Sequence, residues 1–291
     1  MNSCGVLNLC LFSDIIGSCD KYATLESFVD TIECMTTNST LIVYTDDIFF
    51  QECSGLEFAN WIYDYQSQPD LRDLKKELSI QIEKATSIDE EEYNRFLHSV
   101  NTLNVTNGLV MSICDNKSTV LYVGTTSRLW EALQWYLANH VKKSEFVSEA
   151  KNCFPNLYFH PKVYQSFNTL NGDYFTERPI IVAHLHALDA FKERFRELMS
   201  NGIGYREICE EFEATSGIEC SPQASRTATR NLHYEFTNSH TQISEKLLCE
   251  MHTKLKWHGM DRVHQDRIYF HPGKAGIEGN KVLIAHIGTH M

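Results

Sequence analysis

The chain has 291 residues, of which 43% are hydrophobic and 22% charged, a composition typical of globular proteins and unlike that of disordered or fibrous chains. No apolar run approaches the roughly 18 consecutive residues of a membrane helix, and the first residues lack the basic start and cleavage site of a signal peptide. The ten cysteines include no CxxC pair, and most lie in apolar stretches. We therefore expect a cytoplasmic protein with reduced cysteines and no membrane partner.

The net charge of −12 is unevenly distributed along the chain. Residues 1–150 contain 10 basic and 22 acidic side chains, whereas residues 226–291 contain 9 basic and 6 acidic ones. Eight of the 13 histidines also lie in the last 59 residues. The C-terminal third can therefore bind a nucleic-acid phosphate, while the acidic part faces elsewhere and is available to a protein partner.

The first half of the chain has the pattern of an α/β layer. The expected strands are residues 5–14, 39–50, 107–115 and 118–125, the last two joined as a hairpin at Asp115–Lys117. The expected helices are residues 24–35, 55–66, 71–85, 89–103 and 127–141. This order predicts an acidic α/β domain over residues 1–165.

The second half has a different order of elements, after a stretch near residues 154–175 that prolines and glycine interrupt. Two expected helices come first, at residues 179–201 and 205–217. Four β-like runs follow, at residues 232–238, 246–257, 266–271 and 281–290. Helices followed by a strand meander predict an α+β domain over residues 176–291, with two helices and an antiparallel sheet of about four strands.

These C-terminal runs place polar side chains two residues apart, and on a strand such residues share one face. The side chains concerned are Glu250, His252, Lys254 and Lys256, then Arg267 and Tyr269, then His286 and His290. One interpretation is a solvated sheet face. The other is RNA cleavage, which needs a base for the ribose 2′-OH, an acid for the leaving 5′-oxygen and cations for the phosphorane charge. Histidine, glutamate, lysine and arginine are suited to these tasks.

Residues 190–291 resemble the RelE/HigB/YoeB-type toxins, which are small ribonucleases with two helices packed on an antiparallel sheet. The resemblance lies in LCEMHTKL, in Arg267-Ile268-Tyr269-Phe270 and in the closing VLIAHIGTHM. It implies that Arg267 stabilises the transition state, His290 is the general acid, Glu250 or His252 is the base, and Lys254 binds phosphate.

The sequence therefore predicts a metal-independent RNA endonuclease, a toxin-like or phage-defence effector whose partner is RNA, either free or ribosome-associated. Its expected catalytic residues are Glu250, His252, Arg267, Tyr269 and His290. Its expected nucleic-acid contacts are Arg226, Arg230, Lys254, Lys256 and His286. No cofactor is expected. By analogy with toxin fusions, we expect the acidic domain over residues 1–165 to have a sensing or regulatory role.

Two other hypotheses remain open. The first is a non-catalytic subunit of a bacterial defence complex that binds nucleic acid or protein. The second is a Mg²⁺-dependent nuclease of the PIN or Toprim kind, which would use Asp14, Asp46 and Asp47 at the expected strand ends. A histidine metal site is the weaker interpretation of His184 with His186, or of His286 with His290, because ligand partners at the usual spacing are missing.

Overall fold

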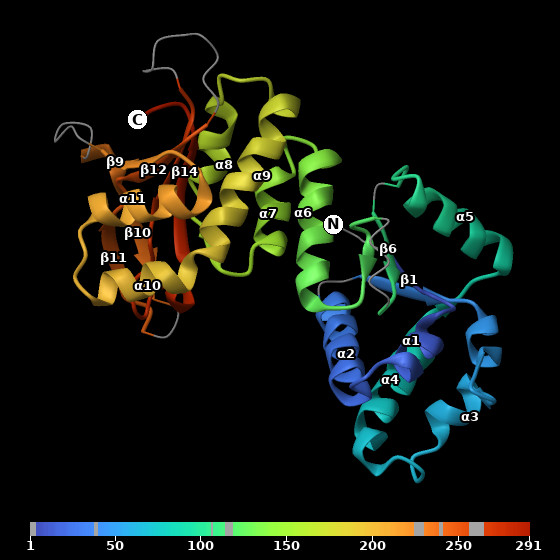
Figure 1. The fold of residues 1–291 in the computed structure, drawn as a ribbon. Coiled ribbons are helices and arrows are strands. Elements are labelled where there is room, and N and C mark those ends of the chain that lie inside the picture. Colours follow the sequence, from blue (N-terminus) through green and yellow to red (C-terminus); the bar gives the residue numbers. More distant parts are fainter. Residues whose placement is uncertain are drawn as a thin grey trace. The chain divides into compact units, whose positions relative to one another are not determined.

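The chain folds into two compact units, Met1–Tyr136 and Leu137–Met291 (Figure 1). The computed structural model describes residues 4–37, 40–105, 107–113, 119–223, 230–238, 241–255 and 265–291. In these ranges no helix is both long and apolar enough to cross a membrane. The division lies earlier than the expected boundary between residues 165 and 176, because a short strand at Leu157–Phe159 pairs with the last strand of the chain.

The N-terminal unit is built around a parallel sheet with the strand order β5-β2-β1-β6-β7. Its strands are β1 (Cys4–Leu7), β2 (Leu41–Tyr44), β5 (Thr86–Ser87), β6 (Gly108–Met111) and β7 (Tyr122–Val123). The short strands β3 (Glu52–Cys53) and β4 (Leu56–Glu57) form a separate pair. The helices are α1 (Leu11–Gly17), α2 (Lys21–Thr37), α3 (Phe58–Tyr63), α4 (Arg72–Lys84), α5 (Glu90–Asn101) and α6 (Thr126–Asn139), whose residues from Leu137 onward belong to the C-terminal unit; 3-10 turns lie at Asp46–Phe50 and Pro69–Leu71. The predicted α/β class is confirmed.

Two details of this unit differ from the sequence-based expectation. The strands β6 and β7 are parallel, so they do not form the expected hairpin. An apolar run reveals a buried strand but not its direction, and the proposed turn at Asp115–Lys117 lies outside the described residues. The expected first strand ends at Leu7, and Asp14 lies in α1, where Leu11, Phe12 and Ile15 bury one side of a helix.

The C-terminal unit contains a five-stranded mixed sheet with the order β8-β14-β13-β12-β9. These strands are β8 (Leu157–Phe159), β9 (Cys220–Pro222), β12 (Met251–Lys254), β13 (Arg267–His271) and β14 (Val282–Gly288), and the strands β10 (His233–Thr237) and β11 (Ser244–Leu248) form a separate hairpin. The helices are α7 (Phe146–Cys153), α8 (Val163–Ser166), α9 (Tyr174–Ala190), α10 (Lys192–Ser200) and α11 (Tyr205–Ser216), with 3-10 turns at Phe167–Thr169, Arg230–Leu232 and Glu278–Asn280. The β8–β14 pair is parallel and the other three pairs of this sheet are antiparallel. Antiparallel strands were expected here, but not the parallel fifth strand.

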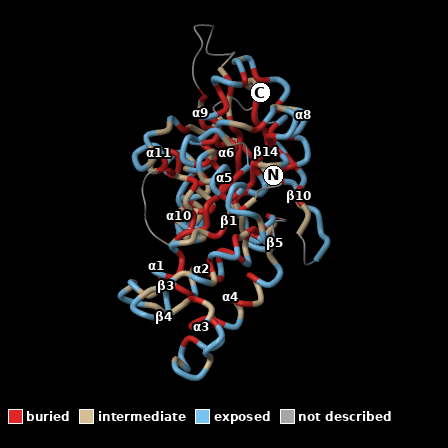
Figure 2. Tube along the Cα trace, turned by 90° about the vertical axis from the view of Figure 1, so that its right-hand side faces the viewer, coloured by how far each residue is buried: buried red, intermediate tan, exposed pale blue. Residues whose placement is uncertain are grey.

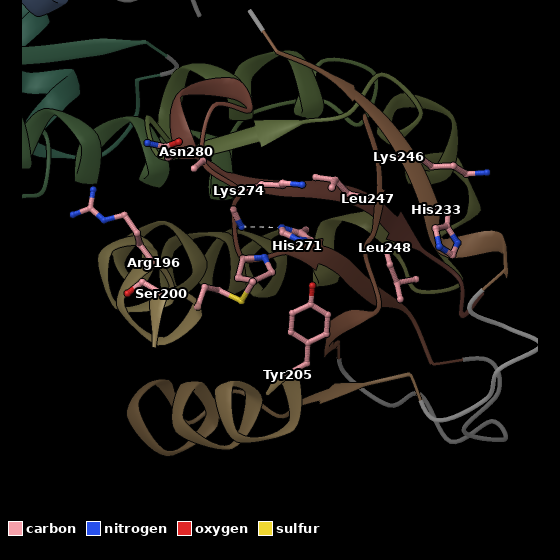
Figure 3. Close-up of a pocket in the computed structure, with 14 residues that line it drawn as sticks. Arg196, Ser200, Tyr205, His233, Lys246, Leu247, Leu248, His271, Lys274 and Asn280 are labelled. Atoms are coloured by element: carbon pink, nitrogen blue, oxygen red, sulfur yellow. Dashed lines mark hydrogen bonds between the residues drawn. The ribbon is translucent and has the colours of Figure 1, made fainter. Parts of the chain in front are cut away.

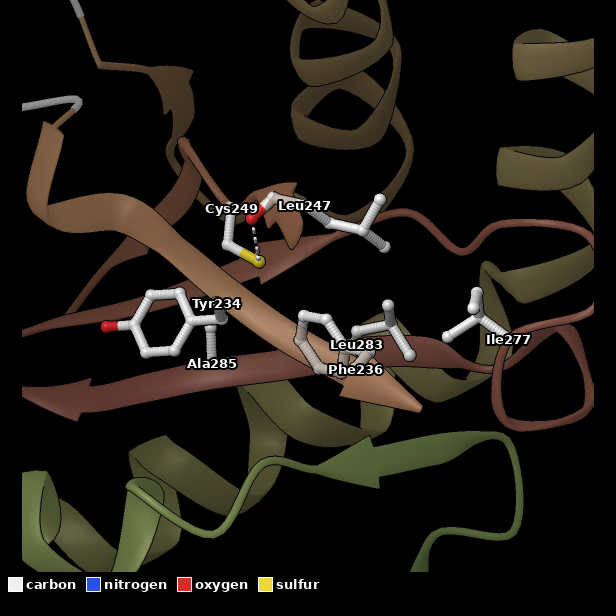
Figure 4. Packing of buried hydrophobic residues seen from close by; sticks show 7 residues of the cluster. All are labelled: Tyr234, Phe236, Leu247, Cys249, Ile277, Leu283 and Ala285. Atoms are coloured by element: carbon white, nitrogen blue, oxygen red, sulfur yellow. Dashed lines mark hydrogen bonds between the residues drawn. The ribbon is translucent and has the colours of Figure 1, made fainter. Parts of the chain in front are cut away.

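Both faces of this sheet are covered. On one face, Phe195 of α10 packs on Phe270 with ring centroids 5.6 Å apart, and His184 of α9 shares a 2.9 Å hydrogen bond with Thr253. On the other face, the β10–β11 hairpin closes an apolar cluster that includes Leu283 of β14 (Figure 4). The complete cluster comprises Tyr234, Phe236, Leu247, Cys249, Ile277, Leu283 and Ala285. All seven residues of β14 are buried as a result (Figure 2).

Two expected elements of this unit are divided in the structure. The expected helix 179–201 is two helices, α9 and α10, which meet at Phe191, where φ is −85° and ψ is 0°. Phe191 packs edge-on against Phe195 and Phe212, so the corner itself forms part of the core. The expected strand 246–257 consists of β11 and β12, which belong to different sheets. A continuous apolar pattern gives no sign of this change of sheet.

A buried arginine closes the end of α6. Arg178 of α9 donates hydrogen bonds to the carbonyl oxygens of Ala138 at 2.6 Å, Asn139 at 2.5 Å and Val141 at 2.7 Å. The last carbonyl oxygens of a helix generally lack partners within it, so the planar charged fork of Arg178 is well suited to the end of α6 and the residues just after it.

We expect Arg178→Met to lower the free energy of unfolding by about 3 kcal/mol, because buried carbonyl oxygens lose charge-assisted hydrogen bonds. Urea unfolding followed by circular dichroism measures this difference. The exposed Arg206 provides a control, and Arg206→Gln should change stability by less than about 0.5 kcal/mol. Equal effects of the two substitutions would contradict the role of Arg178.

Candidate functional site

Four polar side chains form a row across the C-terminal sheet. Ser221 of β9 lies opposite His252 of β12, His252 lies opposite Tyr269 of β13, and Tyr269 lies opposite His286 of β14. The ring centroids of His252 and Tyr269 are 4.9 Å apart, and those of Tyr269 and His286 are 5.6 Å apart. The structure therefore brings together three of the side chains that the alternation of the strands predicted. We call Ser221, His252, Tyr269 and His286 the ring row.

A β-bulge keeps His286 in the ring row. The pairing register shifts so that Tyr269 is opposite His286, whereas Phe270 is opposite Ile284. Ala285 is the extra residue, and it packs in the apolar cluster under the hairpin. The bulge thus lets β14 contribute to the apolar cluster and to the ring row from adjacent positions.

Arg267 lies beside the ring row, one position along the same face of β13. Its neighbours across the sheet are Lys254 and Gly288. Its Nη1 donates long hydrogen bonds of 3.4 Å to Gln223 Oε1 and to Tyr269 Oη. Its Nε is buried and has no hydrogen-bond partner among the described residues. The guanidinium therefore contacts neutral oxygens and has no carboxylate partner among the described residues.

The last residues of the chain fold against the ring row. The Met291 backbone N–H donates to Tyr269 Oη at 3.3 Å, and His286 Nε2 donates to the Thr289 carbonyl oxygen at 2.8 Å. His290 is half-buried, and its pKa is lowered by burial and by the positive charge of Arg267. The imidazole of His290 is therefore accessible to solvent, and it lies near the positive charge of Arg267.

The histidines of the ring row are neutral at physiological pH. Burial and the nearby charge of Arg267 lower the pKa of His252 to about 3, and burial lowers the pKa of His286. Both nitrogens of His252 are engaged, because Nδ1 donates to the Glu250 carbonyl oxygen at 3.2 Å and Nε2 accepts from Ser221 Oγ at 3.3 Å. Such a ring orders its neighbours, but it is a poor proton donor or acceptor for a substrate.

The other candidates are not joined to this site by a described side-chain contact. Glu250 contributes its backbone oxygen to His252, while burial raises the pKa of its carboxyl group. Lys254 is on the expected face but forms an ion pair with Glu219. Arg230 is exposed in a 3-10 turn. Two further candidates, Arg226 and Lys256, lie outside the described residues. Ser221 and Gln223 were not among the predicted site residues, because β9 has only three residues, too few for an alternating pattern.

The acidic candidates of the N-terminal unit hydrogen-bond to hydroxyl groups at the ends of different strands. Asp14 accepts from Ser112 at 3.3 Å, and Asp46 accepts from Ser87 at 2.9 Å. Asp47 accepts from Thr45 at 3.4 Å. In the described part of the chain, no three His, Cys, Asp or Glu residues lie close enough together to hold a metal ion. The described residues therefore give no support to a magnesium site at these aspartates or to a histidine metal site, and the ring row with Arg267 is the candidate site.

No protein-family model, curated protein or solved structure matches this chain. Its function is accordingly inferred from the chemistry of its own residues.

Gly288 allows the end of β14 to approach α8 and the turn that follows it. Its φ is +149°, and a Cβ atom there would lie 2.3 Å from Thr169 Oγ1 and 2.4 Å from the Ser166 carbonyl oxygen. We expect Gly288→Ala to lower the free energy of unfolding by about 3 kcal/mol through this clash and the strained φ. Gly217→Ala is a matched control at a positive φ of 71° in open space, with an expected cost of about 1 kcal/mol. Chemical denaturation distinguishes the two, and a Gly288 variant no less stable than the Gly217 variant would refute the close approach.

Burial of neutral His252 makes the stability of the fold sensitive to acid. Its pKa is about 3 in the folded protein, against an ordinary value of 6.5, so below pH 6.5 the unfolded chain binds a proton that the folded chain does not. This contribution to stability is complete above pH 6.5 and is lost as the pH falls toward 3. His252→Gln lacks the titration, so the stability advantage of the wild type over this variant should shrink by about 2 kcal/mol from pH 7 to pH 5. Urea unfolding at a series of pH values measures it, and a constant difference would exclude a buried neutral His252.

Proposed function

We propose that the C-terminal unit binds single-stranded RNA at Arg267 and cleaves it without a metal ion, as a toxin-like endoribonuclease. One observation supports this most directly. Arg267 lies beside the ring row with a buried, unpartnered Nε among the described residues and no carboxylate partner there, and its charge acts on the half-buried His290. An arginine with neutral partners next to an accessible imidazole suits a phosphate diester.

Each residue has a part in the proposed reaction. Arg267 stabilises the negative charge that develops on the phosphorane, because its planar fork matches the phosphate oxygens. His290 accepts the proton of the ribose 2′-OH as that oxygen attacks phosphorus, since solvent reaches its imidazole and a lowered pKa favours the neutral form of the ring. Lys254, on the same face, contacts the neighbouring phosphate after leaving its partly exposed pair with Glu219. His252, Tyr269 and His286 are positioning residues, which hold Arg267 and the end of the chain in place.

The biological setting follows the resemblance described above. A nuclease in the C-terminal unit and an acidic N-terminal unit suit an effector in antiviral defence, in which the N-terminal unit binds a protein that restrains or recruits it. We place its action in the cytoplasm, on free or ribosome-associated RNA. The protein partner would bind through the acidic side chains of residues 1–136.

The proposal is tested by incubating the full-length protein with end-labelled single-stranded RNA in the presence of EDTA. We expect cleavage by the wild type and a loss of about 100-fold or more in rate for Arg267→Gln and for His290→Gln. Arg206→Gln removes the same charge at an exposed position of α11 and should cleave normally. A DNA strand of the same sequence should remain intact, because it lacks the 2′-OH nucleophile.

Binding is measured separately with a 2′-O-methyl RNA, which cannot be cleaved by this route. Fluorescence anisotropy should show weaker binding for Arg267→Gln and unchanged binding for His290→Gln. Absence of both cleavage and binding would refute the proposal. Cleavage that requires Mg²⁺ and survives both substitutions would move the chemistry to another part of the chain.

A second candidate function is RNA binding without cleavage. It is favoured by the burial of His252 and His286, which leaves His290 as the accessible imidazole of the site, whereas acid–base cleavage of RNA commonly uses two groups. Binding that depends on Arg267 together with intact RNA after prolonged incubation would establish this function instead.

A further inference from the structure

The C-terminal unit contains a pocket of about 580 Å³ at the other end of β13 from Arg267 (Figure 3). It is lined by residues of α10, α11, the β10–β11 hairpin and the loop that follows β13. His271 ends β13 and lies in the middle of this pocket, while Tyr205 extends toward it from the start of α11. The volume falls in the range of pockets that bind small organic ligands. None of the candidate residues from the sequence analysis lines it.

The lining of the pocket is positively charged. Arg196, Lys246 and Lys274 are part of it, and no aspartate or glutamate is. Lys246 is exposed and has no ion pair or hydrogen bond among the described residues. Lys274 and Arg196 form ion pairs with Glu245 and Glu193, which lie outside the lining. Pairs this exposed contribute little to stability, so both cations can turn to a ligand. The lining side chains therefore favour an anion, and the carboxylates that act on the pocket are Glu245, near His271, and Glu250, near Tyr205.

The middle of the pocket offers apolar surface and ring edges. Met199, Leu247 and Leu248 supply aliphatic surface. The rings of Tyr205 and His271 meet nearly at right angles, at 85°, with centroids 6.2 Å apart. A planar ligand gains both apolar burial and ring contacts on such surfaces.

Two neutral donors complement the cations. The Gly273 backbone N–H donates to His271 Nδ1 at 3.1 Å, so the ring proton is on Nε2, for which the described residues provide no partner. Burial lowers the pKa of His271 to about 4, which keeps this tautomer neutral. Burial also raises the pKa of Tyr205, so its phenol keeps its proton. Both groups can donate to oxygen or nitrogen acceptors of a ligand.

The loop that carries Lys274 is held in one conformation. Gly273 has a φ of +107°, and a Cβ atom there would lie 3.0 Å from the Lys281 carbonyl oxygen. The Gly276 N–H donates to Asn280 Oδ1 at 2.9 Å, and Ile277 is buried in the apolar cluster under the hairpin. A loop fixed at both of these points presents its lysine without a large entropic cost on binding.

We infer that this pocket binds a flat-ringed organic phosphate of about the size of a nucleoside monophosphate. Figure 3 shows Lys274 between Arg196 and Lys246, which lie on opposite sides of the pocket, so the phosphate lies at Lys274 and the two outer cations turn toward it, while the ring lies on the apolar surface beside Tyr205 and His271. This binding is independent of the proposed RNA cleavage, because it uses none of the residues at the Arg267 end of β13. It gives the protein a means of responding to a small nucleotide.

Isothermal titration calorimetry of the full-length protein with AMP tests this inference, with adenosine and inorganic phosphate titrated separately. We expect AMP to bind with a dissociation constant below about 1 mM, and each of the two fragments to bind at least about tenfold more weakly. Lys246→Gln and Lys274→Gln should each weaken AMP binding about tenfold, because each removes one charged contact with the phosphate. Lys246 is exposed, so its variant keeps the fold.

Lys281→Gln is the matched control, since it removes the same charge at the end of the same loop but outside the lining, and it should bind AMP as the wild type does. Arg267→Gln should also leave AMP affinity unchanged, which separates this pocket from the proposed RNA site. No binding of AMP, or binding that both lysine variants retain in full, would overturn the inference. Binding of phosphate as tight as that of AMP would overturn the part assigned to the ring.

Discussion

The C-terminal unit depends on the burial of β14 on both of its faces. This strand pairs in parallel with β8 on one side and antiparallel with β13 on the other. Its alternate residues enter the apolar cluster under the hairpin and the core beneath the helices, and its bulge adds His286 to the ring row. The loop before it carries Lys274, and the glycine at its end lies against α8 and the following turn. The strand β14 therefore fixes both the ring row and the loop that carries Lys274.

The strand pattern predicted much of the candidate site. The pleat alone determines that His252 and Lys254 share a face, as do Arg267 and Tyr269, so their placement follows from spacing. The placement of Glu250 could not be predicted in this way, because β12 begins only at Met251. The pairing of β8 could not be predicted either, since this strand has three residues and its partner lies near the far end of the chain. A local sequence pattern shows which residues share one face of a strand, but it does not show which strand pairs with it or whether the pairing is parallel.

Most histidines near the end of the sequence have a structural role, whereas the composition of this segment indicated proton-transfer chemistry. In this part of the chain, His252, His271 and His286 are buried and neutral, and each forms a hydrogen bond that orders a neighbouring strand or loop. Composition indicates only that imidazoles are available, whereas burial decides whether they can exchange protons. At the two ends of β13, Arg267 on one side and Lys246 and Lys274 on the other can contact ligands, whereas most of the histidines are buried.

The parallel pairing of β14 with β8 also determines when this unit can form during synthesis. Helices α7 to α11 leave the ribosome before Val282–Gly288 does, and until then the apolar sides of α9 and α10 have no central strand to cover them. Contacts between such distant segments form slowly, and exposed apolar surface attracts chaperones. A nascent chain therefore lacks the ring row until β14 has been made. Translation itself delays whatever chemistry this unit performs.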